Sequence, residues 1–148
     1  MTPHYRPHQI RWTPEKVGSL WSYYSSNPAY DETYFSKHTG RSILRYIQSH
    51  IPLGDGRILD FGCGKGHMLR LLLDSGYVCQ GLEFSPQSAE LAEETIGEHP
   101  LFEGVIRGQS YPTPVPDSSF NTVLLIEVLE HLFDEQLLPT LEEIRRVL

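Results

Sequence analysis

The chain has 148 residues and a formal net charge of −7, so it is long enough for one domain with its own core and poorly suited to bind a phosphate backbone. No basic cluster offsets this charge, because Glu142 and Glu143 precede Arg145 and Arg146, and we expect no nucleic-acid partner. The chain has two cysteines, neither in a CxxC motif, which argues against a disulfide framework and a structural zinc site. It shows no signal peptide and no long apolar run, which argues against a membrane partner. We therefore expect a cytoplasmic protein.

The first part of the chain, residues 1–52, predicts a helical segment that precedes the main domain. Thr13 followed by Pro14 marks a helix start, because a hydroxyl caps the first turn and proline suits the first helical position. Asn27, which precedes a proline, ends this helix, and a second helix is expected over residues 40–50.

Aromatic side chains are dense in this segment. We expect Trp21 and Tyr24 to pack the first helix on the sheet. Tyr30, Tyr34 and Phe35 are predicted either to pack in the same way or to form a lid that covers a ligand site. Together they make the N-terminal segment a candidate lid or cap.

From residue 53 to residue 148 the pattern alternates between strand and helix. Such alternation predicts an α/β domain with a parallel sheet, and the apolar run NTVLLI is typical of a buried parallel strand. The expected strands are 57–61, 77–83, 102–107 and 121–126, and the expected helices are 67–74, 85–97 and a last one kinked or restarted at Pro139, with Leu141, Ile144 and Leu148 on one face.

The stretch ILDFGCGKGHML places glycines at 62, 64 and 66 directly after the first of these strands. A loop that binds a nucleoside triphosphate needs Ser or Thr after its Gly-Lys pair, and here Lys65 is followed by glycine. A dinucleotide fingerprint needs a third glycine where this chain has His67, which weakens that alternative. The sequence therefore favours a third ligand class, one without a pyrophosphate.

What remains is an acid and three glycines, Asp60, Gly62, Gly64 and Gly66, before a helix. Glycines let a ligand approach the backbone closely, and the helix N-terminus beyond them offers N–H groups and partial positive charge to a carboxylate. Glu83 ends the next expected strand, at the rim where open α/β sheets bind ligands, and a carboxylate there can accept hydrogen bonds from ribose hydroxyls. A tight turn beside a surface acid is the simpler alternative.

Four stretches, taken in order, resemble the class I S-adenosylmethionine-dependent methyltransferases of small-molecule type, similar to those of ubiquinone, menaquinone and sugar biosynthesis. ILDFGCGKG resembles the first motif of that family, and GLEFSP resembles its ribose-binding strand end. GQSYPTPVPDSSFNTV and EVLEHL followed by LEEIRRVL resemble later segments, so the likeness covers residues 57–148. It implies a Rossmann-like parallel sheet with helices on both faces, S-adenosyl-L-methionine as cofactor and a small-molecule methyl acceptor.

The resemblance also implies a role for each candidate site residue. Around the methionine end of the cofactor we expect Asp60, Gly62, Gly64 and Gly66, with the backbone of Cys63 and, from the fourth strand end, Glu127. Glu83 would bind the ribose. The adenine would be surrounded by Phe84, Gln109 and Ser110. Lys65 and His67 are expected to face solvent.

Two departures from the family pattern carry expectations of their own. Gln109 stands where the family often has Asp, although its side-chain oxygen can still accept a hydrogen bond from the adenine amino group. The chain also stops at Leu148, where the family usually continues into further strands. We therefore expect a sheet truncated after about four strands, with residues 121–126 as an exposed edge through which copies could self-associate.

His131, in EVLEH, is the candidate general base for deprotonating the acceptor, or else a structural residue capping the next helix. The Glu-x-x-Glu-His spacing also resembles the magnesium site of some RNA 2′-O-methyltransferases, but we expect no metal, because many relatives carry EVLEH without one. Two further alternatives stay open at this point. One is an NAD(P)-dependent oxidoreductase, and the other is a catalytically silent or truncated subunit with the methyltransferase fold.

Overall fold

The computed structural model describes residues 10–108 and 111–148. Its helices and strands follow one another as α1 (Pro14–Ser26), η1 (Pro28–Thr33), α2 (Phe35–His50), β1 (Arg57–Phe61), α3 (His67–Asp74), β2 (Val78–Glu83), α4 (Pro86–Ile96), β3 (Phe102–Arg107), β4 (Thr122–Leu125), η2 (Leu129–His131) and α5 (Asp134–Val147).

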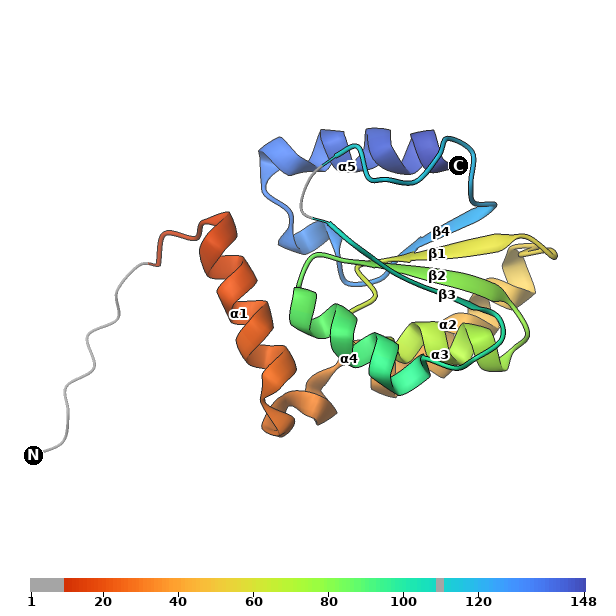
Figure 1. The fold of residues 1–148 in the computed structure, drawn as a ribbon, viewed down its shortest axis with the longest axis horizontal. Helices are drawn as coiled ribbons and strands as arrows, with labels where there is room; N and C mark the ends of the chain where they lie inside the picture. Colours follow the sequence, from red (N-terminus) through yellow and green to blue (C-terminus); the bar gives the residue numbers. More distant parts are fainter. Residues whose placement is uncertain (1–9, 109–110) are drawn as a thin grey trace, which may run out of the picture.

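The described strands form one parallel sheet in the order β3-β2-β1-β4. Helices α2, α3 and α4 cover one face of this sheet and α5 covers the other (Figure 1). The Rossmann-like α/β fold predicted from the alternating pattern is therefore confirmed. β4 lies at one edge of the four-stranded sheet, as expected, and of its residues only Leu124 is buried.

Two hydrophobic clusters hold the layers together, one on each face of the sheet. Successive side chains of β1 alternate between them, as the pleat of a strand requires. Ile58 packs into the cluster under α2 and α3, whereas Leu59 and Phe61 pack into the cluster under α5. Leu44 and Ile47 of α2 belong to the first cluster, so this helix is part of the α/β layer.

Two helices differ from the sequence prediction. α2 begins at Phe35, five residues before the predicted start, because only the short η1 separates it from α1. α5 runs continuously from Asp134 through Pro139 instead of restarting there. Its buried face carries Thr140, Glu143 and Val147, while the predicted apolar residues Leu141 and Leu148 are exposed.

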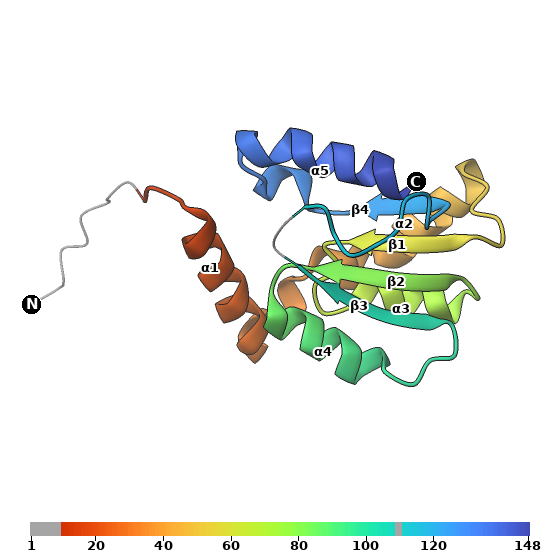
Figure 2. The same ribbon diagram turned by 45° about the horizontal axis from the view of Figure 1, so that its top comes forward.

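α1 stands apart from these layers, beyond the carboxyl ends of the strands (Figures 1 and 2). Thr13 caps it and Ser25 is its one buried residue. Ser25 hydrogen-bonds Ser88 near the start of α4, and this polar contact attaches α1 to the body of the domain. The prediction that Trp21 and Tyr24 pack α1 on the sheet is wrong, because both are half-buried and line the cleft described below. No helix in the described part of the chain is long and apolar enough to cross a membrane.

Candidate functional site

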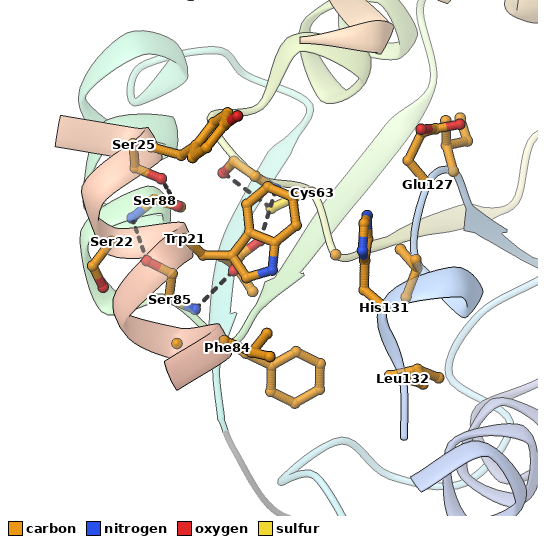
Figure 3. Close-up of a pocket in the computed structure, with 18 of the residues that line it drawn as sticks. Trp21, Ser22, Ser25, Cys63, Phe84, Ser85, Ser88, Glu127, His131 and Leu132 are labelled. Atoms are coloured by element: carbon orange, nitrogen blue, oxygen red, sulfur yellow. Dashed lines mark hydrogen bonds between the residues drawn. The ribbon is translucent and has the colours of Figure 1, made fainter. Parts of the chain in front are cut away.

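A cleft of about 900 Å³ lies between α1 and the carboxyl ends of the strands. Its inner wall is the loop after β1 together with the ends of β2 and β4, and its outer wall is α1 (Figure 3). In a parallel sheet these strand ends meet at one rim, which is where such folds bind ligands. The cleft is large enough for a cofactor together with a small substrate.

The backbone conformation and the packing of the loop after β1 require glycine at two of its positions. Gly62 and Gly66 have φ values of 78° and 81°, in the left-handed region that favours glycine. A Cβ on Gly62 would lie 2.6 Å from Val128, and one on Gly66 would lie 2.6 Å from Ile96 of α4. Gly64, also left-handed, has more room, since the nearest atom to its Cβ position is 3.8 Å away on Tyr34. Gly64 is therefore the place where the backbone is most open to a ligand.

Glu83, at the end of β2, braces this loop. Its carboxylate accepts hydrogen bonds from the backbone N–H of Gly64 at 2.8 Å and of Ser85 at 2.7 Å. Burial raises the pKa of the Glu83 carboxyl, and these backbone donors partly oppose the rise. Each carboxylate oxygen can accept more than one hydrogen bond, so Glu83 retains capacity for a ligand.

Asp60 is the most unusual polar group of the inner wall. Its side chain is 3% exposed, and its Oδ2 atom has no hydrogen-bond partner among the described residues. Burial, and then the charge of Glu83, raise the pKa of Asp60 to about 7. A buried carboxyl without a partner costs stability, and such groups recur where a ligand supplies the missing donor.

The segment after β4 completes the inner wall of the cleft. Glu127 has a φ of 57°, a left-handed conformation that non-glycine residues adopt mainly at turns and functional sites. The His131 ring lies edge-on to Trp21 of α1, with the ring centroids 4.9 Å apart, so these two side chains meet across the cleft (Figure 3). Phe84 and Tyr111 contribute further aromatic surface, with their centroids 6.3 Å apart.

The structure brings most of the predicted site residues together. The cleft is lined by Asp60, Gly62, Cys63, Gly64, Glu83, Phe84, Glu127 and His131. Gly66 does not line it but is buried against α4. Gln109 and Ser110 lie outside the described residues. Burial raises the pKa of the Cys63 thiol well above its ordinary value, so a reactive thiolate is disfavoured there.

The expectation that Lys65 and His67 face solvent is wrong. The Lys65 ammonium donates to Asp31 of η1 at 2.5 Å, and the His67 ring packs on Tyr34. Burial is the main cause that lowers the pKa of His67. These contacts tie the glycine loop to the N-terminal segment, a pairing that a single sequence gives no means to foresee.

Sequence reasoning missed several cleft residues. Trp21, Tyr111 and Thr140 all line the cleft, and the Tyr111 hydroxyl hydrogen-bonds Thr140 of α5 at 2.9 Å. Each belongs to a different segment, so periodicity within a segment could not reveal that they converge. No group of three or more His, Cys, Asp and Glu residues in the described ranges is arranged to hold a metal ion, Glu127, Glu130 and His131 included.

A family model described as a methyltransferase domain matches residues 59–148, which is more than half of the chain. The chain belongs to this family. The match confirms the resemblance seen in the motifs of the sequence, and it covers the whole inner wall of the cleft as well as the segment that carries His131.

Individual relatives agree with this assignment. An uncharacterized methyltransferase from Anoxybacillus flavithermus is 28% identical over 78% of this chain and 51% of its own length. A ubiquinone biosynthesis O-methyltransferase from Thiobacillus denitrificans is 27% identical over 62% of this chain and 40% of its own. A Pyrococcus horikoshii protein of known crystal structure matches 85% of this chain and 60% of its own with a TM-score of 0.70 at 26% identity. The chain spans about half the length of curated relatives such as the first.

Proposed function

We propose that this chain binds S-adenosyl-L-methionine in the cleft and transfers its methyl group to a small molecule. The observation that carries the proposal is the inner wall, where a left-handed glycine loop, the buried Asp60 and the braced Glu83 converge at the rim of a parallel sheet. The family assignment supports the reaction class. When bound, the cofactor would supply an activated methyl group on a sulfonium, so the protein mainly has to position the reactants and exclude water.

The residues of the inner wall fit the cofactor's parts. The partnerless Oδ2 of Asp60 is suited to accept a hydrogen bond from the cofactor's ammonium group. The open backbone at Gly64 and the N-terminus of α3 suit its carboxylate. Glu83 would accept from the ribose hydroxyls while it continues to brace the loop. Phe84, with Gln109 and Ser110 in the segment that follows β3, would surround the adenine.

His131 is proposed to face the acceptor. It follows β4, lies on the cleft and meets Trp21 from the outer wall, so a molecule entering between α1 and η2 would come close to its imidazole. A neutral imidazole there can take a proton from the acceptor as its methyl bond forms. Glu127 would line the cleft at the methionine end of the cofactor.

We further propose that α1 and η1 act as a lid. The polar and ring contacts described between this segment and the rest of the domain are few: Ser25 on Ser88 of α4, Lys65 on Asp31, and ring contacts made by Trp21 and Tyr34. A segment held by a few contacts can open to admit ligands and close to exclude water. Phe35 also lines the cleft, whereas Tyr30 stacks on Tyr24.

Calorimetric titration with S-adenosylhomocysteine tests the cofactor site directly. We expect micromolar binding by this chain and a loss of at least about tenfold in Glu83→Gln, since an amide replaces an acceptor-only carboxylate with a group that cannot bind both hydroxyls equally. Glu90→Gln, on the exposed side of α4, is the matched control and should bind normally. A folded chain that does not bind would refute the proposal and favour a silent member of the family.

A further inference from the structure

The charges around the cleft have one sign. Four of the described residues that line it carry carboxyl groups. The described lining contains no lysine and no arginine. Asp60 and Glu83 belong to the inner wall, where the cofactor is proposed to bind. Glu127, after β4, is proposed for the methionine end of the cofactor, where the acceptor has to meet the methyl group, and Glu15, in the first turn of α1, lines the remaining space.

Lys16 and Lys65 adjoin cleft residues in sequence, but neither lines the cleft. Lys65, in the glycine loop, is engaged by Asp31 and lies over the Tyr34 ring, 5.2 Å from its centroid. Lys16, next to Glu15 in sequence, donates its ammonium to the carbonyl of Arg11 at 2.7 Å. The lining side chains therefore bring carboxyl groups into the cleft and no lysine or arginine.

Aromatic rings also line the cleft outside the part proposed for the cofactor. Trp21 and Tyr24 come from α1, and Tyr111 and Phe133 come from the other side. The faces of such rings are negative and attract cations, while their area suits a flat apolar body. Away from the N-terminus of α3, where the cofactor carboxylate is proposed to bind, an anionic group would meet carboxylates and ring faces with no lysine or arginine among the lining residues.

Resting on the proposed function, we infer that the methyl acceptor is an amine with an apolar body, and that acceptors bearing a carboxylate or phosphate are rejected. In the reaction the uncharged nitrogen forms a bond to the methyl carbon while the carbon–sulfur bond breaks and its electron pair goes to sulfur. The nitrogen thereby becomes positive, and its extra proton leaves to the imidazole of His131 or to water. The carboxylates of the cleft stabilise the positive charge that develops at the nitrogen.

The field in the cleft can be measured without any acceptor. The chain has two tryptophans, so Trp12→Phe leaves Trp21 as the sole fluorophore, on the cleft wall. We measure the ratio of the caesium quenching constant to the iodide quenching constant. We expect this ratio to be several-fold higher for Trp21 than for free N-acetyltryptophanamide. In the double variant Glu15→Gln/Glu127→Gln the caesium-to-iodide ratio should fall towards that of free N-acetyltryptophanamide. In the control double variant Glu94→Gln/Glu98→Gln, which removes the same charge outside the cleft, the ratio should fall much less. A caesium-to-iodide quenching ratio no higher than that of free N-acetyltryptophanamide would overturn the inference.

Head-group preference is the second test. Phenethylamine, phenethyl alcohol and 3-phenylpropionate share a ring and differ in charge, and each can be titrated calorimetrically into the chain loaded with S-adenosylhomocysteine. Phenethylamine should bind on the order of tenfold tighter than 3-phenylpropionate. This ratio of affinities should be smaller in Glu15→Gln/Glu127→Gln. Equal or tighter propionate binding, or no amine binding at millimolar concentration, contradicts the inference. Failure to bind S-adenosylhomocysteine would refute the cofactor proposal instead. The quenching measurement needs no bound cofactor, so it tests the negative charge of the cleft independently.

Discussion

The two walls of the cleft are built in different ways. The inner wall, from Asp60 to Gly66 with Glu83, is made of backbone turns and buried groups that the surrounding core fixes in place. The outer wall, α1, is a helix with one buried residue, and it presents half-buried aromatic side chains to the cleft. The inner wall is thus preorganised by the fold, while the outer wall is held by a handful of side-chain contacts.

This contrast matches the two tasks proposed for the site. A cofactor shared by a whole family needs a fixed backbone cradle, because positioning is most of what methyl transfer asks of the protein. An acceptor must enter and leave, and its recognition falls to side chains on a segment that can open. The contrast predicts that substitutions in the inner wall cost stability and cofactor binding, whereas those in the outer wall alter exchange and selectivity.

The largest effect should come from Gly66→Ala. Its Cβ would clash with Ile96 at 2.6 Å at a left-handed φ, so we expect a loss of roughly 2–4 kcal/mol in the free energy of unfolding and of cofactor binding with it. Gly76→Ala is the control, because Gly76 has a φ of 89° with no heavy atom within 4 Å of its Cβ position. If urea unfolding shows the same loss in the free energy of unfolding for both variants, the packing of Gly66 against α4 contributes nothing to stability.

Glu143→Gln should come next, because this residue fixes the segment that carries Tyr111. The 5% exposed Glu143 accepts from Thr113 at 2.9 and 2.5 Å and pairs with Arg146 at 2.7 Å. We expect a loss of about 2 kcal/mol at pH 7, since a buried charged pair loses one partner.

The pH dependence gives this prediction its sign. The Arg146 guanidinium lowers the pKa of Glu143 to about 2, from 4.5 in an unfolded chain. The stabilisation is therefore present above pH 4.5 and lost as the pH falls towards 2. Urea midpoints of the native chain and the variant should converge between these values. Glu142→Gln, at the exposed neighbouring position, should show no such convergence.

The same contrast explains how far the sequence could be interpreted. The strand–glycine–helix order and Glu83 were predicted because backbone turns and strand ends leave local patterns of residues. The convergence of Trp21, Tyr111 and Thr140 was not predicted, since it depends on how three distant segments pack. The buried face of α5 was predicted at Ile144, which packs on the cluster under this helix, but not at Glu143. Glu143 is buried through its contacts with Arg146 and Thr113, while Leu141 stays exposed.

Asp60→Asn separates stability from binding within the inner wall. The raised pKa of Asp60, about 7 against 3.8, means that the unfolded chain loses this proton first as the pH rises, so the native state is penalised progressively from about pH 4 to pH 7. The amide removes that penalty, and we expect the variant to be roughly 1–3 kcal/mol more stable at pH 8 and equal to the native chain at pH 4.

Binding should move in the opposite direction. S-adenosylhomocysteine should bind Asp60→Asn at least about tenfold more weakly at pH 8, because its ammonium loses a charged acceptor. Asp55→Asn, in the exposed turn before β1, should change neither quantity. A variant that gains stability and keeps full affinity would show that Asp60 does not contact the ligand.

The smallest effect on stability, and the sharpest test of the outer wall, should come from Asp31→Asn. Asp31 receives Lys65 at 2.5 Å and so joins η1 to the glycine loop, while the neighbouring pair of Glu32 and Lys37 lies within the N-terminal segment at 2.6 Å. The pair of Glu32 and Lys37 is exposed, so the melting temperature should hardly change in Glu32→Gln. It should fall slightly more in Asp31→Asn, because the Lys65 side chain is only 14% exposed and loses its partner. The two variants should differ in ligand exchange. If α1 and η1 form a lid latched by Lys65, S-adenosylhomocysteine should leave Asp31→Asn several-fold faster in stopped-flow measurements, and amide hydrogen exchange in α1 should rise, with Glu32→Gln unchanged in both. Equal release rates would mean that the outer wall stays open or stays closed regardless of this contact, and that the contacts of Ser25 with Ser88 and of Trp21 with His131 hold α1 in place.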